Sequence, residues 1–190
     1  GTTLRLLAPA KPGYHVLVCD AVYGLTRRFC DNHLRRFGID VSYYDPLLGA
    51  EIEREFRPDT TIVFTESPGS LTFEVQDLPA LAAVAHARGA RVILDNTWAT
   101  PLGFRSFDHG VDVSLHAATK YIGAHSDVLL AAVIAHAETY VPVHRVCPDT
   151  GLPAPPHRPP QGSPGRPARA LRAPPHPRWE LPHPREGQRT

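Results

Sequence analysis

The chain has 190 residues, a formal net charge of +1 and three cysteines. This length allows one sizeable domain, and the balanced charge gives no electrostatic reason to expect nucleic acid or a membrane surface as a partner. The cysteines form no C-x-x-C pair, which argues against a disulfide scaffold or a metal site and favours a reducing compartment. No apolar run in the sequence is long enough to span a bilayer, so the expected localisation is cytoplasmic.

The first part of the chain alternates short apolar runs with longer helical patterns. Six runs have the length and β-branched content of buried strands, and they lie at 14–19, 41–44, 61–65, 91–94, 111–116 and 128–135. Between them, helical spacing of apolar residues predicts a helix at 25–37, which Gly38 ends, and an Ala-rich pattern predicts a second helix at 78–88, which Gly89 ends. Strands that alternate with helices predict an α/β fold with a mostly parallel sheet.

Residues 142–190 differ in composition from residues 1–141. They hold fourteen of the twenty-one prolines and eight arginines, but no lysine. Such a segment cannot bury enough apolar area to offset its ordering entropy, so we predict a low-complexity tail that is disordered or PPII-like. Three interpretations stay open: translation in a shifted reading frame, a natural linker, and a recognition tail for SH3-like domains or nucleic acid. The predicted organisation is a partial α/β domain at 1–141 and a tail at 142–190.

Lysine is rare in this chain. Arginine supplies eighteen of the twenty Lys and Arg residues, and Lys120 is one of only two lysines. A primary amine can lose its proton and form a Schiff base with an aldehyde, whereas a guanidinium stays protonated. Lys120 follows the predicted strand at 111–116, and Asp95 follows the one at 91–94. Ligands of parallel sheets bind at the carboxyl ends of the strands, so both residues are predicted to lie on the same edge of the sheet.

Four segments together resemble the Cys/Met-metabolism family of pyridoxal-phosphate (PLP) enzymes, in the family's order and spacing. They read DAVYGLTR at 20–27, ESPGSLTFEVQD at 66–77, DNTWATP at 95–101 and AATKYIGAHSD at 117–127. The third segment, with Trp98, resembles the cystathionine β-lyase branch of the family. The γ-synthases and γ-lyases more often carry Phe at this position. The resemblance implies the large domain of an aspartate aminotransferase-like PLP enzyme, a three-layer fold with a mostly parallel sheet.

The resemblance also implies roles for four residues. Lys120 would hold PLP as a Schiff base and then act as the base at the substrate Cα, and Asp95 would pair with the pyridine nitrogen. Tyr23 would stack on the cofactor ring and assist proton transfer; its alternative is a core tyrosine on the first turn of a helix. Thr119 would bind the cofactor phosphate, and its alternative is a β-branched residue that ends a strand. A serine that many relatives use for the same phosphate is replaced here by Ala117.

For three other residues in these segments a structural role is favoured or stays open. Glu66 and Ser67 are interpreted as structural turn residues at the start of a loop near the cofactor. Trp98 would line the mouth of the site or belong to the core. The histidines suggest no metal cluster, and the absence of a G-x-G-x-x-G or P-loop pattern weakens a nucleotide-binding alternative.

The implied reaction is a carbon–sulfur β-elimination on a sulfur amino acid such as L-cystathionine, which gives homocysteine, pyruvate and ammonia. A first alternative is a γ-lyase or γ-synthase reaction of the same family. A second is a non-catalytic product of a broken gene or a Pro-rich interaction protein. The parent enzyme is expected to be a homotetramer that binds neither nucleic acid nor membrane.

Family members are about twice as long, and residue 1 is not Met. We therefore expect the natural start, an amino-terminal arm that reaches the cofactor phosphate, and a carboxyl-terminal domain with the substrate-binding arginine to be missing. The expected consequence is weak PLP binding and little lyase activity in this chain by itself.

Overall fold

The computed structural model describes residues 13–123, 130–136 and 139. The predicted boundary at 141/142 and the tail at 142–190 lie outside these residues, so the proposed division of the chain stays a prediction. Within the described part, no helix is long and apolar enough to cross a membrane.

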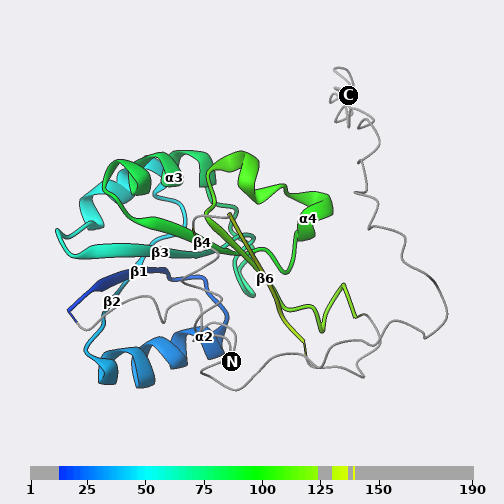
Figure 1. Cartoon of the computed structure of the whole chain (residues 1–190), viewed down its shortest axis with the longest axis horizontal. Helices are drawn as coiled ribbons and strands as arrows, with labels where there is room; N and C mark the ends of the chain where they lie inside the picture. Colours follow the sequence, from blue (N-terminus) through cyan, green and yellow to red (C-terminus); the bar gives the residue numbers. More distant parts are fainter. Residues whose placement is uncertain (1–12, 124–129, 137–138, 140–190) are drawn as a thin grey trace, which may run out of the picture. The chain divides into compact units, whose positions relative to one another are not determined.

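A six-stranded sheet forms the centre of the described part (Figure 1). Its strand order is β2-β1-β3-β4-β5-β6, where the first five strands in this row run parallel and β6 pairs antiparallel with β5. The strands are β1 (His15–Cys19), β2 (Asp40–Tyr44), β3 (Thr60–Glu66), β4 (Arg91–Asp95), β5 (Val113–His116) and β6 (Ala132–Ala135). The chain therefore makes a mostly parallel, mixed sheet, as the sequence predicts.

Helices cover both faces of this sheet. In Figure 1, α2 (Gly24–Phe29) lies on one face and α3 (Leu78–Ala87) on the other. The 3₁₀ segment η3 (Gly49–Glu55) packs against α3. Two short elements, α4 (Thr100–Gly103) and the 3₁₀ turn η4 (Ser106–His109), follow β4. The result is the predicted three-layer α/β arrangement.

The core lies between the sheet and these helices, and the central strands are apolar on both faces. All five residues of β1 are buried, as are Val63 and Phe64 of β3 and Leu94 of β4. Burial on both faces is what a parallel sheet covered by two helix layers requires. The short apolar runs in the sequence therefore mark strands without an alternating polar pattern.

The helical prediction at 25–37 is confirmed in position but differs in detail. The segment continues from α2 into a π-helical turn, η1 (Cys30–Leu34), and ends in a 3₁₀ turn, η2 (Arg35–Phe37). Phe29 and Leu34 are five residues apart, a spacing that suits a π turn better than an α turn. Gly38 ends the segment with φ of 74°, the left-handed conformation that glycine adopts without steric cost.

The helix at 78–88 is confirmed as α3, with Asp77 as its N-cap residue: the Asp77 side chain accepts a hydrogen bond from the Ala80 amide. The three short elements η3, α4 and η4 were not predicted. They span four to seven residues, and such lengths carry too few residues to show a period.

Candidate active site

The carboxyl ends of β1, β3, β4 and β5 meet along one edge of the sheet, which we call the carboxyl rim. In this sheet the chain passes from β1 to β2 on one side and then returns to β3 on the other side of β1. Open α/β sheets bind their ligands in the crevice at such a reversal of strand order. The residues that follow β1 and end β3 are therefore expected in a site, together with those at the ends of β4 and β5.

Asp95 is the last residue of β4 and lies on this rim, as predicted. Its Oδ1 accepts hydrogen bonds from the Thr97 amide at 3.0 Å and from the Thr97 hydroxyl at 2.5 Å. Burial raises the pKa of the Asp95 carboxyl, while the hydrogen bonds from Thr97 and the nearby His116 act in the opposite direction. Among the described residues no Lys or Arg forms an ion pair with Asp95. The carboxylate is thus held in place by neutral donors and open to a cationic partner.

Lys120 lies in the turn that follows β5, and its side chain is exposed. Its amide donates to the Ala117 carbonyl at 2.8 Å, and the Ala117 amide donates to the Thr97 hydroxyl at 2.8 Å. Thr97 thereby joins the Asp95 segment to the turn that carries Lys120. The structure places both residues on the carboxyl rim: Asp95 ends β4, and Lys120 lies in the turn that follows its parallel neighbour β5.

Tyr23 follows β1 and is the N-cap residue of α2. Its side chain is 53% exposed, so the alternative of a core tyrosine is wrong. The Tyr23 amide donates to Glu66 Oε2 at 2.8 Å, which fixes the backbone at the end of β3 and leaves the ring free. Tyr23 is therefore an accessible aromatic group on the rim.

Thr119 has a different environment from the one its predicted role requires. Its hydroxyl donates to the Leu130 carbonyl at 3.0 Å and accepts from the Leu130 amide at 2.9 Å. A hydroxyl has a single proton, and here that proton is used to join the Lys120 turn to the segment before β6. Phosphate binding by this hydroxyl stays a prediction. It would require the hydroxyl to give up its hydrogen bond to the Leu130 carbonyl and to donate to the phosphate instead.

Glu66 and Ser67 were interpreted as structural turn residues. In the structure Glu66 is a strand residue that contacts other parts of the rim. Glu66 ends β3 and is paired in register with Asp95. The loop is tied to the strand ends by the buried Gln76, whose amide group donates to the Glu66 carbonyl at 2.9 Å and accepts from the Tyr44 hydroxyl at 2.8 Å. The sequence contains one signal for a site role of Glu66: like Asp95, it places a carboxylate at the end of an apolar strand.

Trp98 is 57% exposed, which rules out the core alternative, while its place at the mouth of the site stays a prediction. Its ring contacts Phe73 edge to face, with 6.4 Å between centroids. Phe73 is itself 59% exposed and belongs to the loop after β3. The rim therefore presents aromatic surface beside its carboxylates.

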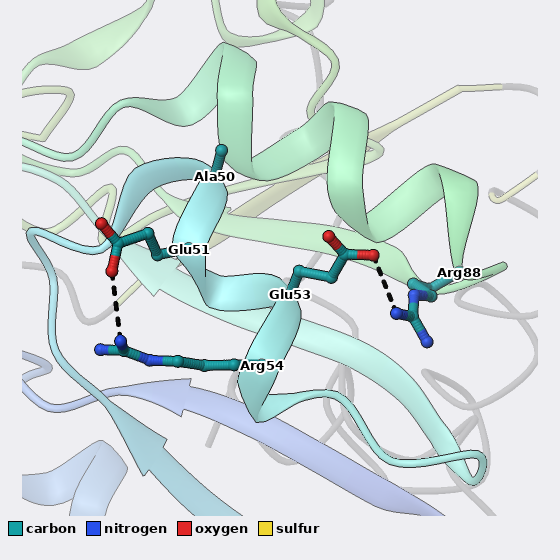
Figure 2. Close-up of a pocket in the computed structure, with 5 residues that line it drawn as sticks. All are labelled: Ala50, Glu51, Glu53, Arg54 and Arg88. Carbon is teal, nitrogen blue, oxygen red and sulfur yellow. Dashed lines mark hydrogen bonds and ion pairs between the residues drawn. The ribbon is translucent and has the colours of Figure 1, made fainter.

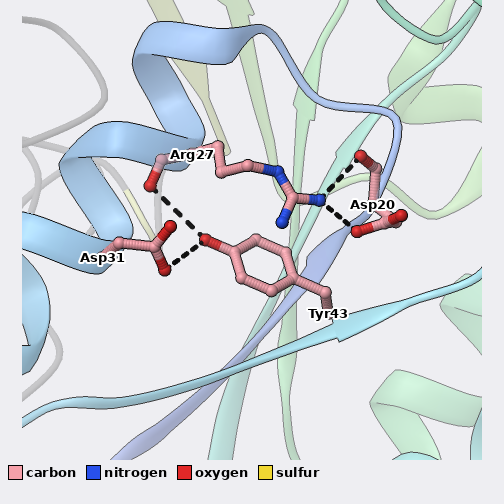
Figure 3. A network of polar contacts seen from close by, with 4 residues as sticks. All are labelled: Asp20, Arg27, Asp31 and Tyr43. Atoms are coloured by element: carbon pink, nitrogen blue, oxygen red, sulfur yellow. Dashed lines mark hydrogen bonds and ion pairs between the residues drawn. The ribbon is translucent and has the colours of Figure 1, made fainter.

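Two hollows of the described part are lined by none of the predicted site residues. One, of about 530 Å³, is lined at the ends of β1 and β2 by Asp20, Tyr43, Tyr44, Asp45, Pro46, Leu47 and Glu74. Figure 3 shows the polar network beside it: Arg27 pairs with Asp20 and lies over the Tyr43 ring at 3.9 Å, while the Tyr43 hydroxyl donates to Asp31 at 2.9 Å. These charges are already paired, so this network has no free group for chemistry.

The second hollow lies between η3 and α3 and is lined by Ala50, Glu51, Glu53, Arg54 and Arg88 (Figure 2). Glu51 pairs with Arg54 at 3.2 Å and Glu53 with Arg88 at 2.8 Å, and all four side chains are largely exposed. Exposed pairs of this kind contribute little to stability. The carboxyl rim is the better candidate for a site.

A family model described as "Cys/Met metabolism PLP-dependent enzyme" matches residues 1–158. The chain belongs to the Cys/Met metabolism family of PLP-dependent enzymes. A putative cystathionine beta-lyase of Rhizobium johnstonii is 57% identical over 136 residues, which cover 72% of this chain and 34% of that relative. The chain thus spans about a third of that relative's length.

Solved structures agree with this family and with the fold. The crystal structure of metB from Corynebacterium glutamicum matches with a TM-score of 0.76 and 27% identity, over 79% of this chain and 40% of that one. Cystathionine gamma-lyase from Lactobacillus plantarum, complexed with L-serine, matches with a TM-score of 0.71 and 30% identity, over 76% and 40%. The predicted family, fold and cofactor are therefore confirmed.

The groups on the rim suit PLP, the cofactor of this family. A PLP site needs a primary amine for the aldehyde, an anion for the ring nitrogen and a flat apolar surface for the ring. Lys120 supplies an exposed amine, Asp95 a partly buried carboxylate without a cationic partner among the described residues, and Tyr23 an exposed aromatic ring.

Proposed function

We propose that this segment carries the cofactor-binding part of a PLP-dependent carbon–sulfur β-lyase, with Lys120 as the residue that bonds to the aldehyde. The observation that supports this most is the shared rim: Asp95 ends β4, and the turn with Lys120 follows β5, the parallel neighbour of β4. The name of the Rhizobium relative, a putative cystathionine beta-lyase, supports the reaction class.

Bound PLP supplies an electron sink for the electrons released when a substrate loses its Cα proton. In this proposal Asp95 holds a proton on the ring nitrogen, because a carboxylate kept in place by Thr97 stabilises a positive charge beside it. Lys120 would hold the aldehyde carbon of the cofactor, and its amine would move the Cα proton of the substrate. Tyr23 covers the ring and limits access of water.

Thr119 is proposed to contribute to the phosphate end of the site. Its hydroxyl and amide now both contact the Leu130 backbone. A phosphate would compete for the hydroxyl proton with one carbonyl group, and a charged acceptor makes the stronger hydrogen bond.

We further propose a sulfur amino acid such as L-cystathionine as the substrate, a cytoplasmic location and a homotetrameric parent enzyme that binds neither nucleic acid nor membrane. The division into a cofactor-binding part at 1–141 and a Pro/Arg-rich tail at 142–190 belongs to the same proposal. Its support is the resemblance in the four segments and the composition of the tail.

A second candidate is γ-elimination or γ-replacement on the same rim. The observation that favours it is the structural match to a cystathionine gamma-lyase. Proton removal at Cα and the ring pairing with Asp95 are common to both reactions, so the rim residues do not distinguish them. The departing group differs: it leaves from Cβ in one case and from Cγ in the other.

The keto-acid product separates the two reactions. The purified chain is incubated with PLP and L-cystathionine beside the Lys120→Ala variant, and the keto acids are identified by mass spectrometry. Because the chain by itself is expected to have little lyase activity, we expect only a small excess of pyruvate over the level of the variant, and a large excess would show that the expected loss of activity is wrong. Formation of 2-oxobutanoate instead would support the γ reaction, and equal product in both proteins would contradict a role of Lys120 in turnover.

A further inference from the structure

Glu66 and Asp95 form a pair of carboxyl groups on the carboxyl rim. They are the last residues of β3 and β4, and the register of the parallel ladder sets them opposite one another. Paired residues of neighbouring strands direct their side chains to the same face of a sheet, and the strands are about 5 Å apart. The two acids therefore share one local environment.

Glu66 has a specific hydrogen-bond partner on the rim. Its Oε2 accepts the Tyr23 amide at 2.8 Å, across forty-three residues of chain. Tyr23 has φ of −51° and ψ of 134°, an extended conformation immediately before α2. The contact therefore fixes the point where the chain turns from β1 into α2, and with it the root of the exposed Tyr23 side chain.

The titratable groups around the pair of Glu66 and Asp95 lie on three strands. On β1, burial raises the pKa of Cys19 to about 11, so this thiol stays neutral at physiological pH. On β5, burial lowers the pKa of His116, so its imidazole is neutral as well. On β4 lies Asp95, whose two hydrogen bonds from Thr97 favour its charged form. No Lys or Arg in the described part of the chain forms an ion pair with Glu66.

These surroundings let the pair ionise in two separate steps. Burial raises the pKa of Glu66 to about 7, the hydrogen bond from the Tyr23 amide acts against this, and the charge of Asp95 adds to it. Asp95 loses its proton first, because the Thr97 donors stabilise its carboxylate. Near neutral pH, Glu66 then exchanges between its neutral and charged forms while it holds the Tyr23 amide.

We propose that Glu66 is a positioning residue that couples Tyr23 to Asp95: one carboxyl group holds the backbone of the aromatic residue and responds to the charge of its neighbour. Its relevance to catalysis rests on the proposed function, in which Tyr23 and Asp95 contact the cofactor ring. The coupling itself is a property of the chain without cofactor. A charged Glu66 holds the Tyr23 amide more strongly than the neutral acid, since charge-assisted hydrogen bonds are stronger.

Nuclear magnetic resonance of the isotope-labelled full chain without cofactor tests this coupling. We expect the Tyr23 amide proton to move downfield as the pH rises, with a midpoint near the pKa of about 7 of Glu66. In Glu66→Gln, whose side-chain carbonyl is still an acceptor, the amide should keep its low-pH position and lose the titration. In Glu66→Ala the acceptor is gone, so the amide should move upfield and exchange faster with water.

Asp95→Asn provides the second arm. Removal of the neighbouring negative charge should lower the midpoint seen at the Tyr23 amide, because Glu66 then ionises without a like charge beside it. Glu51→Gln is the matched control, since Glu51 is an exposed carboxylate on η3 that pairs with Arg54. It should leave the midpoint unchanged.

The proposal would be overturned if the Tyr23 amide shift still titrated in Glu66→Gln as it does in the native chain. It would also be overturned if Asp95→Asn left the midpoint of this titration unchanged. Both variants keep the size of the native side chain, so the test does not depend on the folding of Glu66→Ala. The spectra are recorded without PLP, so a failure here is distinct from a failure of the chain to bind PLP at Lys120.

Discussion

The Thr97 hydroxyl joins two residues of the candidate site: it donates to Asp95 Oδ1 and accepts a hydrogen bond from the Ala117 amide at 2.8 Å. Asp95 ends β4, and Ala117 begins the turn that carries Lys120. One side chain thus spans the gap between the carboxylate and the lysine turn. The position of the Lys120 backbone relative to Asp95 depends on this bridge, on the hydrogen bond from the Asn96 amide to the Leu115 carbonyl and on the pairing of β4 with β5.

Replacement of Thr97 by Val removes the bridge while keeping the shape of the side chain. The Ala117 amide loses its acceptor and Asp95 loses one donor, so we expect a loss of about 1–3 kcal/mol in the free energy of unfolding. The pKa of Asp95 should rise, because a hydrogen bond to its charged form is lost. Urea unfolding and carboxyl carbon shifts measure the two effects. Thr97→Ser retains the hydroxyl and should restore both; failure to do so would contradict the bridge.

Glu66 gives the stability of the chain a distinctive pH dependence. Its folded pKa of about 7 lies above the ordinary glutamate value of 4.5, so the folded state binds the proton more tightly than the unfolded state between these values. The free energy of unfolding therefore falls as the pH rises through this window, by roughly 2 kcal/mol after allowance for partial exposure. Glu66→Gln should remove this decline.

The comparison is made as the difference between the native chain and Glu66→Gln, from about pH 5 to about pH 8. Burial lowers the pKa of His15 and His116, and groups of that kind destabilise the fold as the pH falls below about 6.5. Both histidines are present in the two proteins, so their contribution cancels. A difference that stays constant over the range would show that Glu66 does not titrate there.

The loop after β3 approaches the end of β1 closely at Gly69. A Cβ at this position would lie 2.7 Å from the Ala21 Cβ, an atom fixed to the backbone. Gly69→Ala should therefore displace the loop and cost about 1–3 kcal/mol in thermal or urea unfolding. At Gly24, on the first turn of α2, a Cβ meets nothing within 4 Å, so Gly24→Ala is the matched control. It should be neutral or stabilising by up to about 1 kcal/mol.

The sequence predicted the sheet well, because a strand that is buried on both faces appears in the sequence as a short continuous apolar run. Each of the six strands came from a short apolar run, and the ends differ by a few residues. Asp95 and Lys120 were placed on one edge of the sheet because parallel strands have a common carboxyl end. Nothing local in the sequence distinguishes β6 as antiparallel, since its pairing with β5 depends on a contact distant in the chain.

The parts of the site that were missed depend on long-range contacts. The role of Glu66 rests on its register with Asp95 and on the amide of Tyr23, and neither is visible from neighbouring residues. The contact between Thr119 and Leu130 likewise depends on how the chain returns to the sheet. Tyr23 and Trp98 each had a core alternative, because exposure of an aromatic residue is decided by packing rather than by its type.

The most direct test of the central claim uses the fact that the chain has only two lysines, Lys11 and Lys120. The chain is incubated with increasing PLP, reduced with borohydride and mapped by peptide mass spectrometry, beside the variants Lys11→Arg, Lys120→Arg and Asp95→Asn. We predict saturable labelling of Lys120 that persists in Lys11→Arg, is lost in Lys120→Arg and weakens in Asp95→Asn. Equal, unsaturable labelling of both lysines, unaffected by Asp95→Asn, would contradict the assignment of Lys120 as the cofactor lysine.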